Sequence, residues 1–178
     1  MQFRTFLAVL VGAAGPALAQ TGAPIEIGID AGISRVTASA NSVSQSLTIT
    51  QIPVQSVRVT FPVNPHFSIE PALSLISFSG DGDSQTSYAV EVGAPIYFTP
   101  DYKRPQVYAR PAIGFTHDTF FSGGGGDHTM LGAGIGVRVP SGDRFAFRFE
   151  GRYQHFSEDR GISSHSIGLI AGLSFLTR

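Results

Sequence analysis

Residues 144–153 read RFAFRFEGRY and carry the clearest structural signal in the chain. The odd positions of this stretch are mainly aromatic: Phe145, Phe147, Phe149 and Tyr153. The even positions are charged or small: Arg144, Ala146, Arg148, Glu150 and Arg152. A period of two puts successive side chains on opposite faces of a β-strand. The stretch therefore predicts a strand with one aromatic face and one charged face.

The same alternation recurs along the chain, and no stretch shows a helical period. Clusters of Gly, Pro, Asn, Asp and Ser separate the alternating segments, as hairpins require. The sequence predicts eight antiparallel strands that follow one another up and down. Besides 144–153, the segments are Ile25–Val36, one that begins between Ser46 and Val54 and ends at Phe61, Phe67–Leu75, Tyr88–Ile96, Val107–Phe115, Leu131–Val139 and Ser166–Phe175.

The links between these segments alternate in length. Pro62–Pro65 and Pro140–Asp143 are tight turns, and Thr99–Pro105 is intermediate. Short turns at one end and longer loops at the other are typical of membrane barrels. The remaining links are polar and longer: Ala38–Gln45, Gly80–Gln85, Phe121–Asp127 and Ser157–Ser164.

The first residues predict export. Arg4 is followed by the apolar stretch Phe6–Gly15, which is too short to span a bilayer, and by Ala17-Leu18-Ala19 before Gln20. This arrangement is typical of a secretory signal peptide with its cleavage site. We therefore divide the chain into a signal peptide, residues 1–19, and a single barrel domain, residues 20–178.

The charges indicate which face of the strands points inward. Five acids and five bases share the polar face with Gly, Ala and Ser: Glu26, Asp30, Glu70, Glu91, Glu150, Arg58, Arg110, Arg138, Arg148 and Arg152. A closed lumen needs such a balance, since an unpaired buried charge is costly. Aromatics at strand ends suit interfacial girdles: Phe61, Phe67, Tyr97, Phe98, Phe115 and Phe175. We predict a closed transmembrane β-barrel whose lumen is plugged by paired Arg and Glu side chains.

Four sequence motifs indicate a resemblance to a known family: FSIEPALSL (67–75), YARPAIGFTH (108–117), RFAFRFEGRY (144–153) and IGLIAGLSF (167–175). In this order they resemble the eight-stranded outer-membrane barrels of the outer-membrane protein A and X type. The resemblance implies residence among outer-membrane lipids of a Gram-negative-type bacterium, and insertion by the barrel-assembly machinery. One departure is the ending Phe175-Leu176-Thr177-Arg178, because such chains usually end on an aromatic residue.

The function expected from these observations is structural. We expect a monomeric barrel that anchors or presents its outer loops to a surface ligand the sequence does not identify. With a net charge of −1, the chain has no positive electrostatic field that would bind nucleic acid. We expect no enzyme activity and no cofactor. A narrow or gated pore is one alternative.

A second alternative is an esterase. His155 and Ser157 share one strand face and resemble the His-x-Ser of outer-membrane lipid A deacylases, in which the His activates the Ser. Glu158 stands where those enzymes carry Asn, and no outward acid on the last strand is placed to orient His155. These departures favour the structural reading.

Other motifs have plain structural readings. Gly132, Gly134 and Gly136 lack the spacing of a nucleotide-binding loop and follow the strand alternation, so we expect them to line the lumen. Four histidines border the longer loops: His117, His128, His155 and His165. There is no Cys to help them, and we expect no metal site.

Cleavage before Gln20 is testable by mass spectrometry of the protein from isolated membranes. Removing 19 of the 178 residues should leave 159, with Gln20 at the amino terminus. The control is Ala17→Arg together with Ala19→Arg, which removes the small residues that signal peptidases require and should leave Met1 in place. An intact Met1 in the wild type would contradict the prediction.

Overall fold

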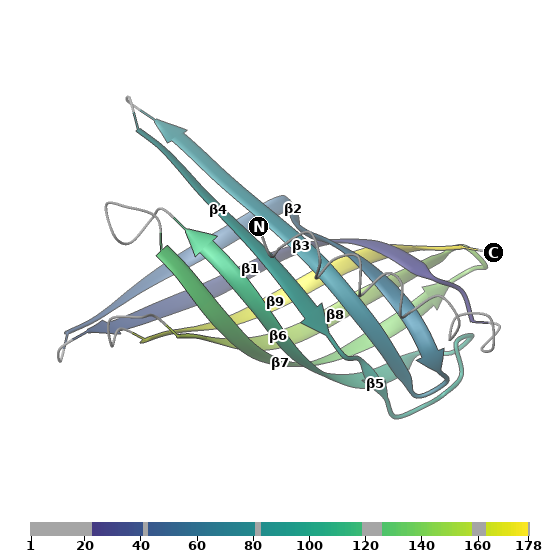
Figure 1. The fold of residues 1–178 in the computed structure, drawn as a ribbon. Helices are drawn as coiled ribbons and strands as arrows, with labels where there is room; N and C mark the ends of the chain where they lie inside the picture. Colours follow the sequence, from purple (N-terminus) through teal and green to yellow (C-terminus); the bar gives the residue numbers. More distant parts are fainter. Residues whose placement is uncertain (1–22, 41–42, 81–82, 119–125, 158–162, 178) are drawn as a thin grey trace, which may run out of the picture.

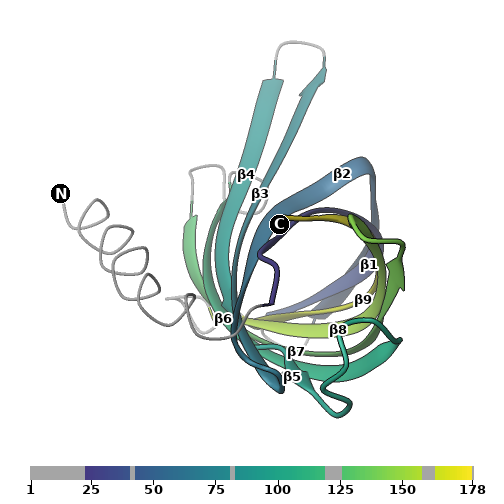
Figure 2. The same ribbon diagram turned by 90° about the vertical axis from the view of Figure 1, so that its right-hand side faces the viewer.

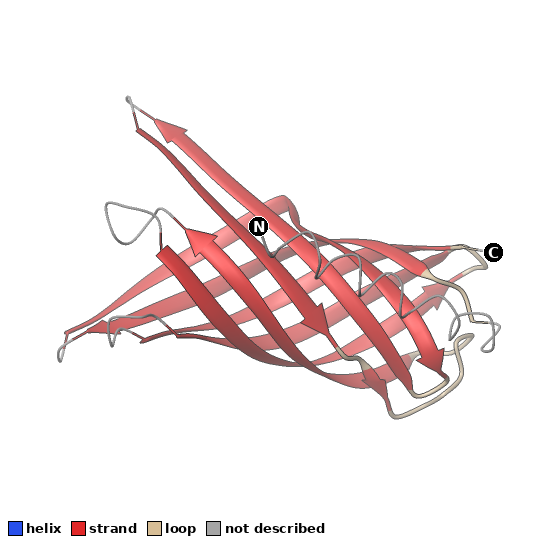
Figure 3. Cartoon of the chain, viewed as in Figure 1, coloured by secondary structure: helices blue, strands red, loops and turns tan. Residues whose placement is uncertain are grey.

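The structure is a computed structural model that describes residues 23–40, 43–80, 83–118, 126–157 and 163–177. All regular structure in these ranges is β-strand (Figure 3). No helix in them is long and apolar enough to cross a membrane. The predicted signal peptide lies outside the described residues. The strands are β1 (Glu26–Ala40), β2 (Val43–Asn64), β3 (Phe67–Gly80), β4 (Asp83–Gly93), β5 (Ile96–Tyr97), β6 (Gln106–Asp118), β7 (Gly126–Ser141), β8 (Phe145–Ser157) and β9 (Ser163–Leu176).

The strands close into a barrel (Figures 1 and 2). Strands that follow one another in the chain pair antiparallel, except that β4 and β5 do not pair with each other and each lies between β3 and β6. β1 pairs with β9 from Glu26 opposite Leu176 to Ser39 opposite Ser163. This last ladder joins the two ends of the sheet. Closure matters because a lipid-exposed sheet edge would leave backbone N–H and C=O groups without partners.

The short strand β5 continues β4 across a local break. Gly93, the last residue of β4, lies opposite Ala112 of β6. The register is unchanged three residues later, where Ile96 lies opposite Ala109. Pro95 occupies the break, and proline has no N–H to donate to a ladder. β4 and β5 therefore form one wall strand, and the predicted closed eight-stranded barrel is confirmed.

The hairpins at the end opposite the tight turns reach further than the sequence predicts. β1 and β2 stay paired up to Ala40 and Val43, so most of the link expected at 38–45 is ladder. β3 and β4 likewise pair up to Gly80 and Asp83. The hydrogen bonds of a backbone ladder form whether or not the side chains of one face are apolar. Thr also has a high propensity for strands. The hydrophobic alternation therefore ends before the strands do.

The predicted start of the second strand, between Ser46 and Val54, is wrong. β2 begins at Val43, and Pro53 falls inside it. The register with β1 shifts between Asp30 and Gly32, which lie opposite Ser56 and Gln51. Residues 52–55 of β2 form this irregularity, so the proline sits where no ladder N–H is required.

Side chains alternate between the lumen and the outside of the wall. On β8, Phe147 and Phe149 are 45% and 53% exposed, whereas Arg148 and Glu150 are 5% and 3% exposed. The polar face therefore points inward and the apolar face points outward, as predicted. Exposed apolar side chains on the other strands include Ile27, Ile29, Ile33, Val57, Leu73, Leu75, Ile113, Leu131, Ile135, Ile167 and Leu169.

The expected aromatic girdle needs one correction. Phe98 and Phe175 are exposed, and Phe145 packs edge-to-face on Phe175 with ring centroids 5.1 Å apart. Tyr97 instead faces the lumen, where it is 5% exposed and packs on Tyr108 at 5.7 Å. It follows Ile96, an outward residue, and so falls on the inner face by alternation.

An arginine on the outer face should be penalised according to its depth. Phe149 lies midway along the apolar run of β8 that begins at Phe145 and ends at Tyr153. Phe149→Arg should lower the free energy of unfolding in lipid vesicles by about 2–4 kcal/mol, and Phe145→Arg at the border by about 0–1 kcal/mol. Denaturant titration of folded barrels measures both. Equal, negligible costs would mean that this face does not contact lipid.

Candidate functional site: a charge network in the lumen

Ten charged side chains fill the lumen and define what we call the lumen charge network. They are the predicted five acids and five bases: Glu26, Asp30, Glu70, Glu91, Glu150, Arg58, Arg110, Arg138, Arg148 and Arg152. Nine are buried, and the side chain of Arg152 is only 10% exposed. Each lies within ion-pair distance of a partner of opposite charge.

Glu70 of β3 is the centre of the network and is fully buried. Its carboxylate lies 2.6 Å from Arg148, 2.7 Å from Arg110 and 3.6 Å from Arg58. The Thr60 hydroxyl also donates to it at 2.6 Å. One acid thus serves three guanidinium groups from three other strands.

Six of these charges close a ring of alternating sign. From Glu70 it passes through Arg110, Glu91, Arg152, Glu150 and Arg148, and then returns to Glu70. Arg152 lies 2.7 Å from Glu150 and 3.6 Å from Glu91. The ring joins β3, β4, β6 and β8 through the interior, whereas backbone hydrogen bonds join only strands that are adjacent in the wall.

Two further pairs extend the network towards the tight-turn end. Arg58 lies 3.1 Å from Asp30 and so attaches that acid to Glu70. Arg138 lies 2.5 Å from Glu26, and its guanidinium also donates to the backbone oxygen of Tyr102 at 3.1 Å. Tyr102 belongs to the loop after β5, so this contact ties the loop to the lumen.

Several neutral lumen residues, which the charge pattern of the sequence does not identify, complete the site. The Tyr108 hydroxyl donates to Glu150 at 2.8 Å and accepts from Arg148 at 2.5 Å. The Arg148 guanidinium also lies 4.8 Å from the centre of the Tyr108 ring, a cation–π distance. The period-two alternation could have identified them, because Tyr108 and Thr60 fall on the inward faces of their strands with Arg110 and Arg58.

Glycines give these long side chains room. A Cβ at Gly134 would lie 2.6 Å from the Glu150 carboxylate, and one at Gly28 would lie 2.5 Å from the Arg58 guanidinium. Gly132 and Gly136 also face the lumen, against Gln154 and Tyr108. The glycine-rich stretch of β7 is therefore part of the lumen packing, as predicted.

His155 and Ser157, the candidate esterase residues, lie at the end of β8 outside the lumen. They share the outer face with Tyr153, and Ser157 is exposed. No hydrogen bond joins them, and within the described ranges no acid contacts His155. Glu158 lies outside the described residues. The arrangement lacks the contact through which a base would activate the serine.

The four loop-border histidines are spread around the barrel. His117 lies 2.6 Å from Asp127 and stacks on Tyr88, with ring centroids 5.2 Å apart. His128 points into the mouth of the lumen, and His155 lies opposite His165 on the outer wall. Among described residues, no three His, Cys, Asp or Glu side chains form a group suited to a metal ion.

Comparisons with known proteins identify the family of the chain and a similar fold. A family model described as the outer membrane protein β-barrel domain matches residues 5–175. The fold is similar to that of Neisserial surface protein A, at 14% identity and a TM-score of 0.60 over 85% of this chain and 97% of that one. Ail of Yersinia pestis is 12% identical over 85% and 98% of the two chains, with a TM-score of 0.47. No curated protein sequence matches the chain.

Removing the carboxylate of Glu70 should destabilise the barrel more than removing that of Glu150. Glu70→Ala leaves three buried arginines without a shared acid, whereas Glu150→Ala affects two. Breaking one buried pair costs about 3–5 kcal/mol, and we expect Glu70→Ala to reach or exceed this range in denaturant titrations. The control Asp101→Ala removes an exposed ion pair with Arg104 and should cost less than about 1 kcal/mol. Similar losses for Glu70→Ala and Asp101→Ala would contradict the prediction.

Proposed function

Because the chain belongs to the family of outer membrane protein β-barrel domains, whose place is the outer membrane of Gram-negative bacteria, we propose that it acts as a closed structural barrel. In this role the wall anchors the protein in the membrane, and the long hairpins present their tips to a surface partner. The lumen carries no solute.

The observation that supports a closed barrel most directly is the ring of six charges around Glu70 and Glu150. It crosses the interior between β3, β4, β6 and β8. A permeating ion would have to displace guanidinium and carboxylate groups that are already paired, and unpairing a buried charge is costly. A narrow or gated pore would need this ring to rearrange.

The proposal includes a route to the membrane. An exported precursor loses residues 1–19, and the barrel-assembly machinery inserts the remainder as a monomer among outer-membrane lipids. The closed wall supports this, because its ladder is completed by its own strands β1 and β9. A closed sheet needs no partner chain to satisfy its edges there.

The proposed role is also non-catalytic. Its support is the outer position of His155 and Ser157, which have neither a mutual hydrogen bond nor an orienting acid within the described part of the chain. Among the described residues, the buried ion pairs are instead in the lumen, where each of the ten charged side chains of the network has a partner of opposite charge. Groups held this way stabilise the wall and are not free for proton transfer.

Planar-bilayer recording tests the closed lumen. The folded wild-type barrel should give no large, steady conductance, because the ring blocks the interior. Glu91→Ala combined with Arg152→Ala removes one acid and one base together and should preserve net charge while thinning the plug. Rare, small openings in this double variant alone would support the ring as the block. Large, steady currents through the wild type would replace the structural role with a pore.

A further inference from the structure

Arg35 differs from the other arginines of the described strands. Those five, Arg58, Arg110, Arg138, Arg148 and Arg152, all point into the lumen and pair with acids there. Arg35 is exposed on the outer face of β1, two positions after Ile33, and no described acidic side chain pairs with it. An arginine on the lipid side is tolerated only near an interface.

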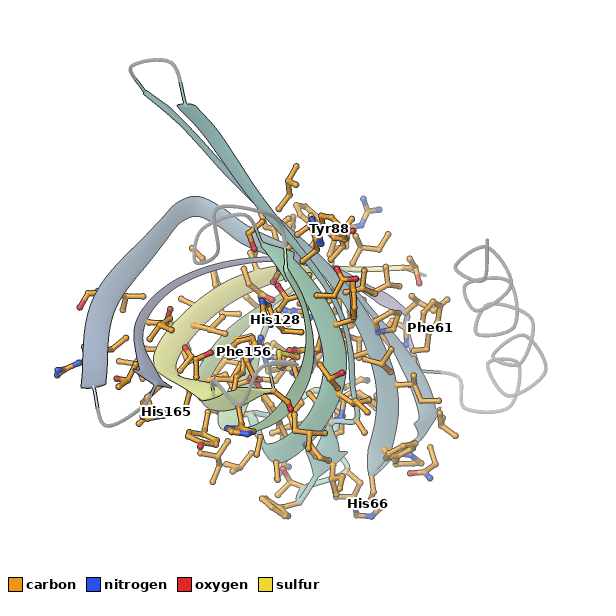
Figure 4. The ribbon with its side chains drawn as sticks, turned by 60° about the vertical axis from the view of Figure 1, so that its left-hand side comes forward. Phe61, His66, Tyr88, His128, Phe156 and His165 are labelled. Carbon is orange, nitrogen blue, oxygen red and sulfur yellow. The ribbon has the colours of Figure 1, made fainter. Side chains whose placement is uncertain are left out.

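Two histidines share the outer wall with Arg35: His165 on the adjacent strand β9, and His155 one strand further on, in β8. His155 of β8 is directly opposite His165 of β9. Tyr153 stacks on His165 along a diagonal of that pair, with ring centroids 6.3 Å apart. Arg35 occupies the equivalent diagonal on the other side of His165, since Arg35 and Tyr153 both lie opposite Ile167. Figure 4 shows His165 on the outside of the wall, whereas Phe156 lies within its mouth.

These residues mark the border of the apolar band. Towards the tight-turn end, Ile33 lies one step from Arg35 and is 48% exposed, and Ile167 lies one step from His165 and is 62% exposed. One step the other way, Thr37 lies opposite His165, and its hydroxyl is 3.0 Å from that of Ser46. The outer face thus changes from aliphatic to hydroxyl-bearing at Arg35. In a bilayer this is the level at which lipid headgroups begin.

We propose that Arg35, His155 and His165 bind the phosphate group of a lipid in the outer leaflet. The guanidinium of Arg35 supplies a fork of N–H donors that matches phosphate oxygens. Each imidazole supplies at least one further donor. Tyr153 fixes the His165 ring by stacking, so this donor is oriented before the lipid arrives. The inference rests on the proposed function, because it requires the barrel to span the outer membrane with this rim outermost.

The test measures lipid binding to the folded, mature barrel in micelles of a non-ionic maltoside detergent, which has no phosphate. The probes are diphosphoryl lipid A, the same lipid after enzymatic removal of its phosphates, and inorganic phosphate. Native mass spectrometry gives the bound fraction over a titration of each probe. We expect diphosphoryl lipid A to bind and the dephosphorylated lipid to bind at least about tenfold more weakly, since removing the phosphates removes the charged acceptors of these hydrogen bonds.

The matched variants are Arg35→Gln and Arg144→Gln. Both remove an exposed arginine, but Arg144 lies in the tight turn before β8, at the opposite end of the wall. Arg35→Gln should weaken binding of diphosphoryl lipid A about tenfold, and Arg144→Gln should leave it unchanged. Equal binding by the two variants, or by the two lipids, would overturn the site. Tight binding of inorganic phosphate would overturn its assignment to a lipid. Insertion into vesicles and a closed lumen would persist in each case, so the proposed function is judged separately.

Discussion

The contact between the Glu70 carboxylate and the guanidinium groups of Arg58, Arg110 and Arg148 is the constraint on which the barrel interior depends. A carboxylate with no exposure to water must be paired, and Glu70 is paired with three arginines that are themselves almost unexposed. The glycines of the inner face follow from this, because the guanidinium groups need the space that side chains would fill. The apolar outer face follows as well, since five of the six arginines in the described strands point into the lumen and leave mainly apolar side chains facing outward.

The same division of polarity explains why the sequence predicted the fold so fully. Period-two alternation gives each residue a face, and the charge balance decides which face is inside. For Phe147 against Arg148 this reasoning held on both counts. It failed where the ladder continues without a hydrophobic pattern, as at Ala40 and Val43, and at Pro53, where an irregularity absorbs the proline.

The sequence predicted which charged residues line the lumen, but not which of them pair with one another across it. Alternation placed all ten charges on one face, yet it carried no information on which strand meets which across the lumen. Glu150 stood out in the sequence because Arg148 and Arg152 flank it on one strand. Glu70 proved to be the centre because its arginines come from β2, β6 and β8, and that convergence depends on how the closed barrel staggers its strands. Tyr108 was overlooked because a tyrosine among strand residues reads equally well as packing.

The alternating sign along β8 has a consequence for how the barrel finds its register. A one-residue slip of β8 would send Arg148, Glu150 and Arg152 into lipid and bring phenylalanines inside. A two-residue slip keeps every side chain on its proper face, and hydrophobicity alone would accept it. It would, however, set Glu150 where Arg148 or Arg152 belongs, and so bring carboxylate against Glu70 or Glu91. The charges of the inner face thus disfavour a two-residue slip of β8 during assembly, a misalignment that the apolar outer face would tolerate.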